Sequence, residues 1–122
     1  MPVRDARRAF PAIARLGRVT LCRVFGRMPR IARPSWRAAA NEVPGLPVPD
    51  FLHHHPAGTA PILVDLAGIE ARGVTGICLM SWEEDLRATV AHAAGTGLPV
   101  HVFGRSSARF IQSTVASFHV ID

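Results

Sequence analysis

The chain has 122 residues, enough for one domain of ordinary size, and 48% of them are apolar, which excludes a disordered polymer. No apolar run approaches the roughly 18–20 residues that a membrane span needs. All fourteen basic residues are Arg: residues 1–37 hold ten of them against one acid, Asp5, whereas residues 38–122 hold four Arg against eight acids. The composition therefore predicts a mildly acidic domain behind a strongly basic N-terminal third.

The first segment, residues 2–17, mixes apolar and basic side chains around Pro11. Because proline breaks a helix interior, we expect a loose basic lead-in here, separate from the domain that follows at residues 18–122. The β-branched, apolar run of residues 19–25 predicts a buried strand. The fold is thus expected to begin near residue 19.

A short helix and a short strand are expected next. Ser35 is a suitable N-cap, and Pro34 is not expected inside the helix, which should end at Pro44 and Gly45. Residues 46–48 predict a short strand weakened by prolines, and residues 49–59 predict a loop.

The second half of the chain alternates helices with strands. Strands are predicted at residues 75–81, 98–103 and 118–121, and helices over residues 61–72, over residues 82–94 and after Ser106 or Ser107. Leu86, Val90 and Ala93 should form the inner stripe of the middle helix, which Gly95 and Gly97 should end.

This alternation predicts an α/β fold: a single-domain, Rossmann- or flavodoxin-like parallel sheet of four to five strands with helices on both faces. Ligands of such open sheets bind at the carboxyl ends of the strands. In this chain those ends are residues 25–30, 52–55, 81–85 and 104–107.

The two cysteines, Cys22 and Cys78, lie inside apolar runs, which predicts buried free thiols and a reducing, cytoplasmic location. Arg15 and Arg18 interrupt every apolar stretch near the N-terminus, so no secretory signal is expected. A transit peptide within the Arg-rich first 37 residues is the alternative. An all-Arg basic composition is typical of GC-rich bacterial or phage genomes.

The histidines do not predict a metal site. Three consecutive histidines on a loop, residues 53–55, point in different directions, although His55 is a candidate ligand contact. His92 and His119 are isolated in the sequence and are expected to be structural.

A cluster of arginines surrounds the end of the first predicted strand. Arg30 and Arg33 are candidate contacts to phosphate or nucleic acid, because guanidinium groups pair well with phosphate oxygens. The alternative is a solvated basic loop.

The acids Glu83, Glu84 and Asp85 follow the clearest predicted strand. Carboxylates there could act as nucleophile or general acid/base at a glycosidic bond, or could simply complement a helix dipole. The sequence holds no phosphate-binding P-loop, dinucleotide fingerprint, paired-cysteine motif or Gly-x-Ser-x-Gly elbow, and we expect no cofactor.

A series of short motifs runs through residues 19–103. They are Gly26-Arg27-Met28, RPSWRAAA at residues 33–40, VPDF at 48–51, DLAGI at 65–69, ICLMSWEE at 77–84, Ala88, Ala93, and GLPV at 97–100. In order and spacing the series resembles small phage and bacterial proteins related to nucleoside 2-deoxyribosyltransferases, which have a Rossmann-like fold.

The resemblance implies a nucleoside or nucleotide bound at the strand ends, cleavage or transfer at an N-glycosidic bond, and assembly into a homo-oligomer. It implies a site lined by Gly26, Arg27, Met28, Trp82 and Glu83, with Trp82 near the base or ribose. Glu84 and Asp85 are the candidate catalytic carboxylates.

Several positions depart from the family pattern. Arg27 replaces the proline of Gly-Pro-Met, Met80 and Ser81 replace the Pro-Gly before the tryptophan, and Ala91 stands where the family has its nucleophilic glutamate. These departures predict weakened or lost catalysis. The alternative function is a non-enzymatic protein that binds nucleic acid or another acidic partner through its arginines.

Overall fold

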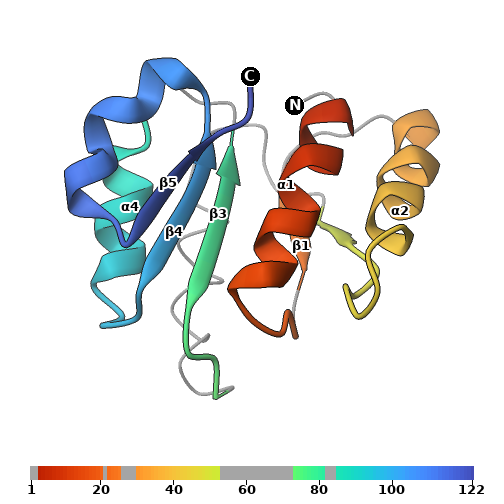
Figure 1. Cartoon of the computed structure of the whole chain (residues 1–122), viewed down its shortest axis with the longest axis horizontal. Helices are drawn as coiled ribbons and strands as arrows, with labels where there is room; N and C mark the ends of the chain where they lie inside the picture. The colour runs from red at the N-terminus through yellow and green to blue at the C-terminus, as the bar shows by residue number, and fades with distance from the viewer. Residues whose placement is uncertain (1–2, 21, 26–29, 53–72, 82–84) are drawn as a thin grey trace. The chain divides into compact units, whose positions relative to one another are not determined.

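The computed structural model describes residues 3–20, 22–25, 30–52, 73–81 and 85–122, and the chain has a mixed α/β fold (Figure 1). It divides into two compact units, Met1–Gly58 and Thr59–Asp122. Each unit has its own helices and its own parallel strands. No helix in the described ranges has the length and apolarity to cross a membrane.

The first unit begins with a helix, α1 (Val3–Leu16), where the sequence predicts a loose lead-in. That prediction is wrong: Pro11 lies inside the helix, although an interior proline costs roughly 3 kcal/mol. The helix has an apolar face, on which Ala6, Ala9 and Phe10 are buried. Burial of this face offsets the missing backbone hydrogen bond, which is the usual way that packing overrides propensity.

A second helix, α2 (Arg33–Asn41), follows the 3₁₀ turn η1 (Arg30–Ala32) and packs against α1. The rings of Phe10 and Trp36 meet edge to face with centroids 6.2 Å apart. The predicted cap was wrong, because Pro34 lies in the first turn of α2 and Ala32, not Ser35, is the N-cap. A proline is tolerated there since the first amides of a helix have no intrahelical acceptor.

The strands of the first unit are β1 (Arg23–Phe25) and β2 (Asp50–Leu52), which pair in parallel. β1 is shorter than predicted, and β2 lies in the predicted loop rather than at residues 46–48. The reason lies in Pro47 and Pro49, which cannot donate to a ladder, whereas the Asp50 amide donates to the Cys22 carbonyl over 3.0 Å.

The second unit is built on β3 (Ile77–Ser81), β4 (Val100–Gly104) and β5 (Ser117–Val120), in the order β3-β4-β5 and all parallel. All three strands were predicted, within one to two residues at each end. The predicted single sheet of four to five strands is not confirmed, because the described strands form one two-stranded and one three-stranded sheet. The predicted helix over residues 61–72 lies outside the described residues.

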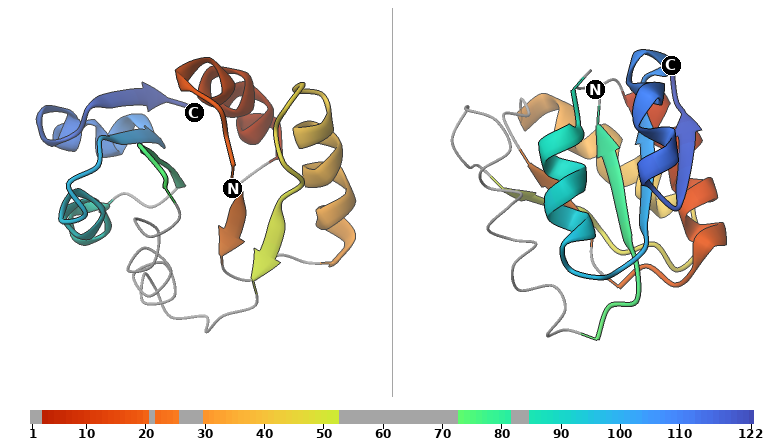
Figure 2. Two further views of the ribbon diagram at one scale, coloured as in Figure 1. Left: turned by 90° about the horizontal axis from the view of Figure 1, so that it is seen from below. Right: turned by 90° about the vertical axis from the view of Figure 1, so that its left-hand side faces the viewer.

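Two helical segments belong to this sheet, α4 (Arg87–Ala94) and η3 (Ser106–Thr114), and Figure 2 shows both on the same face of it. Leu86, Val90 and Ala93 are buried as predicted. α4 begins later than predicted, so Asp85 precedes it rather than lying in its first turn. The last helix is a 3₁₀ helix with Arg105 at its N-cap, not Ser106 or Ser107.

The burial of the two cysteines also differs from the sequence prediction. Both are free, but Cys22 is half-buried and Cys78 is exposed. Burial, together with the nearby Asp50 carboxylate, raises the pKa of the Cys22 thiol to about 11. This thiol is therefore protonated and unreactive at neutral pH.

Candidate functional site

The carboxyl ends of β3, β4 and β5 meet at one edge of the second unit's sheet, where parallel sheets usually receive ligands. Polar residues follow each of these ends, namely Asp85 after β3, Arg105 and Ser106 after β4, and Asp122 after β5. We call this group of four residues the carboxyl edge. The edge combines guanidinium, hydroxyl, amide and carboxylate groups from three chain segments.

The Asp122 carboxylate holds the start of η3. It accepts hydrogen bonds from the Ser106 amide (3.0 Å) and the Ser106 hydroxyl (3.2 Å), and it lies 3.9 Å from Arg105 Nε. The Ser106 amide, more than any other group, lowers the pKa of Asp122. The carboxylate thus occupies an amide and a hydroxyl that could otherwise bind a phosphate oxygen.

Asp85, the one candidate catalytic carboxylate that the structure describes, is exposed and paired with Arg87. Its oxygens accept from Arg87 Nε (3.0 Å), from Nη2 (2.8 Å) and from the Arg87 amide (3.1 Å). These bonds, the side-chain bond first, lower the pKa of Asp85 to about 2. Asp85 therefore carries no proton at neutral pH, and a nucleophilic role would require release from Arg87.

The remaining predicted site residues fall into two groups. Arg30 lies in η1 and Arg33 begins α2, so these two phosphate candidates occupy neighbouring turns of the first unit. Seven others lie outside the described residues: Gly26, Arg27, Met28, His55, Trp82, Glu83 and Glu84.

A second polar group lies on the strands themselves and was missed by the sequence reasoning. His101 Nδ1 lies 2.6 Å from Ser117 Oγ, and the same oxygen lies 2.9 Å from His119 Nε2. We call these three residues the His–Ser–His cluster. His119 was expected to be structural, and its contacts with Ser117 and Phe103 were not foreseen from the sequence.

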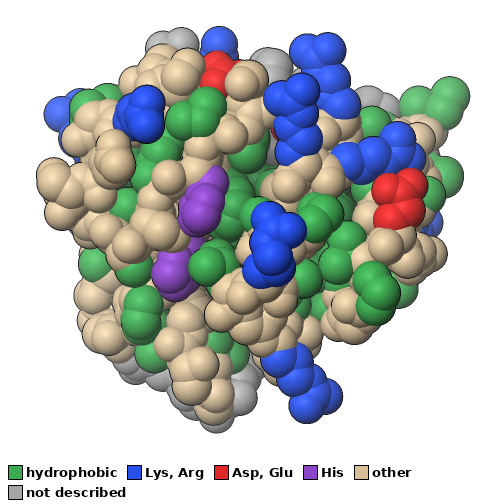
Figure 3. Space-filling model, in the orientation of Figure 1, with side chains coloured by type: hydrophobic (Ala, Val, Ile, Leu, Met, Phe, Trp, Pro, Cys, Tyr) green, Lys and Arg blue, Asp and Glu red, His purple; other side chains and the backbone are tan. Residues whose placement is uncertain are grey.

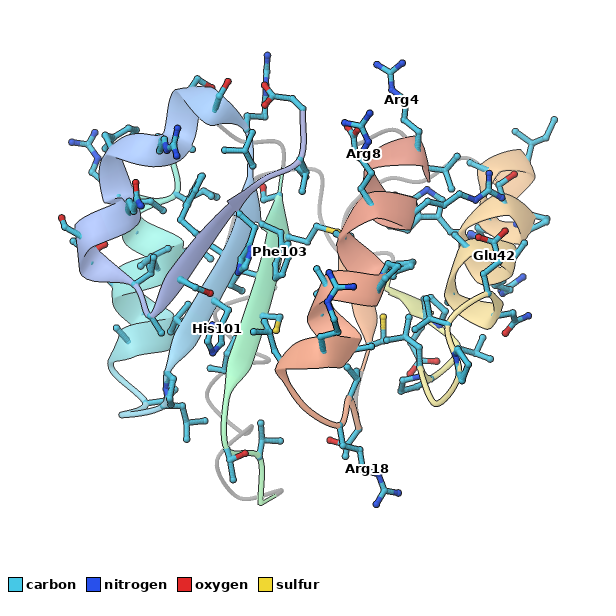
Figure 4. The ribbon with its side chains drawn as sticks, viewed as in Figure 1. Arg4, Arg8, Arg18, Glu42, His101 and Phe103 are labelled. Carbon is cyan, nitrogen blue, oxygen red and sulfur yellow. The ribbon has the colours of Figure 1, made fainter. Side chains whose placement is uncertain are left out.

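Strand register explains how the cluster forms. In the β4–β5 pair His101 is opposite Ser117 and Phe103 is opposite His119, so all four side chains share one face of the sheet. Val100, Val102 and Gly104 take the other face and are buried. Figure 4 shows His101 and Phe103 on their common face of β4.

The surroundings of His119 favour its neutral form. Its ring stacks on Phe103, with centroids 4.3 Å apart and planes 8° from parallel. Partial burial, and secondarily the proximity of His101, lowers the pKa of His119 below 6.5. At neutral pH the ring therefore has one unprotonated nitrogen that can accept a hydrogen bond.

The cluster does not have the ligand set of a metal centre. Across the described parts of the chain, no three residues among His, Cys, Asp and Glu are grouped so that they could hold a metal ion. Two imidazoles and one hydroxyl instead suit proton transfer between neighbouring groups.

The third candidate is the exposed basic face of α1. Arg4, Arg8 and Arg15 are exposed and lie within about 40° of one another around a helix of 3.6 residues per turn. Figure 3 shows the basic side chains in a row along α1, and Figure 4 labels Arg4, Arg8 and, beyond the helix end, Arg18. Arg7, on the flank, pairs with Glu42 over 3.5 Å.

A hollow of about 200 Å³ lies beside the end of α1, lined by residues that include Ala14, Arg18, Pro44 and Leu46. It is smaller than the roughly 300–1,000 Å³ of typical small-molecule sites. We therefore do not assign a nucleoside to it.

Comparison of the chain with protein-family models, with curated proteins and with solved structures finds no match in any of the three.

Proposed function

We propose that the protein binds a nucleoside or nucleotide at the carboxyl edge of its sheet, has a Rossmann-like fold related to nucleoside 2-deoxyribosyltransferases, and has weakened or lost N-glycosidic catalysis. The observation that carries this proposal is the meeting of the β4 and β5 ends, where Asp122 accepts hydrogen bonds from Ser106 and lies 3.9 Å from Arg105 Nε. The end of β3, which precedes Asp85, is parallel to them in the same sheet. Arg105 supplies the positive charge that a phosphate requires, and the carboxylates can accept from ribose hydroxyls.

Two features support the loss of catalysis. Ala91, which stands where the resembling family has a nucleophilic glutamate, is an exposed residue of α4 without a functional group. Asp85 is already bound by Arg87. A carboxylate nucleophile that is displaced or occupied loses orders of magnitude in rate, because catalysis depends on its position to within about 1 Å.

Calorimetric titration with 2′-deoxynucleosides and their 5′-monophosphates tests the binding. We expect saturable binding, tighter for the monophosphate, and chromatography of the same mixtures should show little or no release of free base. Binding of none of these compounds would contradict the proposal, whereas fast turnover that Glu84→Gln abolishes would contradict only the loss of catalysis.

Variants at the edge sharpen the test. Arg105→Gln should weaken monophosphate binding about tenfold, the rough effect of removing one charge-assisted hydrogen bond of 1.5 kcal/mol. Asp122→Ala should strengthen it, because the competing carboxylate is removed from Ser106. Arg109→Gln, an exposed arginine of η3 outside the edge, is the matched control.

The exposed arginines of α1 favour one alternative, binding of a nucleic-acid backbone. Polyanion affinity would then fall with salt by about 0.9 log units per log unit of salt for each phosphate engaged. Joint replacement of Arg4, Arg8 and Arg15 by Gln should reduce that slope, with Arg109→Gln as the control. A slope that the triple variant leaves unchanged would reject this alternative.

A further inference from the structure

We propose that Ser117 is a nucleophile toward small activated acyl esters, with His119 as its general base and His101 as a positioning residue. This site is distinct from the carboxyl edge and does not depend on the proposed nucleotide binding. The observation that carries it is one serine hydroxyl within hydrogen-bond distance of two imidazole nitrogens, at 2.6 and 2.9 Å. A hydroxyl bonded to a base that is itself held in place is the recurring arrangement of nucleophilic serines.

Proton accounting limits the chain of hydrogen bonds to two directions, of which the proposal takes one. Ser117 has a single hydroxyl proton, so it can donate to one imidazole and must accept from the other. We assign the donation to His119 Nε2 and the acceptance from His101 Nδ1–H. His101 then holds the hydroxyl in line with the base.

The base is held by its neighbours. Phe103 is 1% exposed and stacks on the His119 ring at 4.3 Å, which fixes the plane of the imidazole. His101 and Ser117 are opposite each other in the β4–β5 ladder, which fixes the separation of their backbones. A site built on strands keeps its geometry better than one built on loops.

The residues of the His–Ser–His cluster are partly exposed. His101, Ser117 and His119 are all half-buried rather than enclosed, and Figure 3 shows histidine side chains at the molecular surface. The helical segments α4 and η3 lie on the opposite face of this sheet (Figure 2).

The reaction balances without any group beyond the ester and water. Ser117 Oγ forms a bond to the ester carbonyl carbon, and its proton passes to His119 Nε2. As the bond to the leaving oxygen breaks, His119 gives that proton to the oxygen, so that an alcohol or phenol leaves and the imidazole is neutral again. Water then attacks the acyl carbon and gives a proton to His119. The Oγ–acyl bond breaks, Ser117 regains its proton, and a carboxylic acid leaves.

A fluorophosphonate probe and p-nitrophenyl acetate test the proposal on the full chain. We expect one fluorophosphonate adduct per chain, mapped by peptide mass spectrometry to Ser117, with loss of fluoride. We also expect release of p-nitrophenolate that Ser117→Ala abolishes and that the matched control Ser113→Ala, an exposed serine of η3, does not change.

Separate variants distinguish the roles of the two imidazoles. His119→Gln should slow modification about 10²–10⁴-fold, the usual range for loss of a general base, and should abolish its pH dependence. His101→Gln should slow it less, about tenfold, and His92→Gln, an exposed histidine of α4, should have no effect.

Three results would overturn the proposal: no adduct at all, an adduct at a residue other than Ser117, or a larger loss in His101→Gln than in His119→Gln. A cluster that only stabilises the sheet predicts the first of these. Native circular dichroism of each variant separates loss of reaction from loss of folding. The pH profile of His119→Gln gives a second readout that a structural role would not move.

Discussion

The two units of the chain use parallel strands in different ways. In the described part of Met1–Gly58 the strands are three residues long and form a pair, and the buried apolar side chains come mainly from two helices that meet at Phe10 and Trp36. In Thr59–Asp122 three strands of four or five residues form the centre, and α4 and η3 pack on one face. The short pair leaves its unit dependent on helix packing, whereas the longer sheet carries polar groups both on one face and at the carboxyl ends of its strands.

The charged residues are also distributed unevenly between the two units. Ten of the fourteen arginines lie in the first unit, and six of the nine acids lie in the second. The first unit therefore offers electrostatic attraction over a helix face, which is long-range and weakly selective. The second offers hydrogen-bonded groups at fixed distances, which suit recognition or chemistry at one atom.

Core truncation should give the largest effects and should distinguish the units. Phe10→Ala should cost about 3–5 kcal/mol of unfolding free energy and Leu86→Ala about 2–5 kcal/mol, since both side chains are buried. Amide hydrogen exchange should show the loss of protection mainly in the unit that carries each substitution. Equal loss in both units for both variants would contradict this assignment of the two cores.

Two glycines give a matched test of turn geometry. Gly45 in the first unit has φ +82° and Gly97 in the second has φ +81°, a region where an L side chain is strained. Replacement of either by Ala should cost about 1–2 kcal/mol in thermal or denaturant unfolding. Gly17→Ala, which has no atom within 4 Å of the added Cβ and no positive φ, should cost less than either.

The sheet and helices of the second unit could largely be predicted from the sequence because their signals are local. The run around Val102 lies between Gly97 and Gly104, the apolar run around Cys78 follows Gly76, and the stripe of Leu86, Val90 and Ala93 has helical period. The first unit was harder, because α1 contains Pro11 and is stabilised by contacts that no local pattern reveals. Tertiary packing overrode propensity there.

The two candidate sites of the second unit also differ in how far they could be predicted from the sequence. That the ends of β3 and β4 lie at the same end of the sheet follows from parallel topology and could be predicted. The His–Ser–His cluster could not be predicted, because His101 lies sixteen residues before Ser117 and the two meet only through the β4–β5 register. The one sequence signal is the period of two that places Ser117 and His119 on the same face.

A fall in pH should lower the unfolding free energy of the second unit through protonation of His119. Its pKa in the folded protein lies below 6.5, so the unfolded chain takes up a proton first as the pH falls. Stability should therefore be full above pH 6.5 and decline below it until the folded-state pKa is passed. Chemical unfolding at a series of pH values should show this decline, and His119→Gln should flatten it. A stability that rises on acidification through this range would contradict the assigned direction.

We expect the smallest effect on stability from a change at the Asp85–Arg87 pair. NMR titration of its carboxyl carbon should give a midpoint near 2, because Arg87 donates to both oxygens. Arg87→Gln should return the midpoint toward 3.8, with little change in stability because the pair is exposed.

An amide chemical-shift titration with a 2′-deoxynucleoside 5′-monophosphate tests the central claim most directly, because it locates the ligand on one unit or the other. We predict saturable shifts at Asp85, Arg105, Ser106 and Asp122, with shifts at Arg4, Arg8 and Arg15 small and removed by added salt. Saturable shifts confined to α1, or no shifts at the carboxyl edge, would contradict the claim.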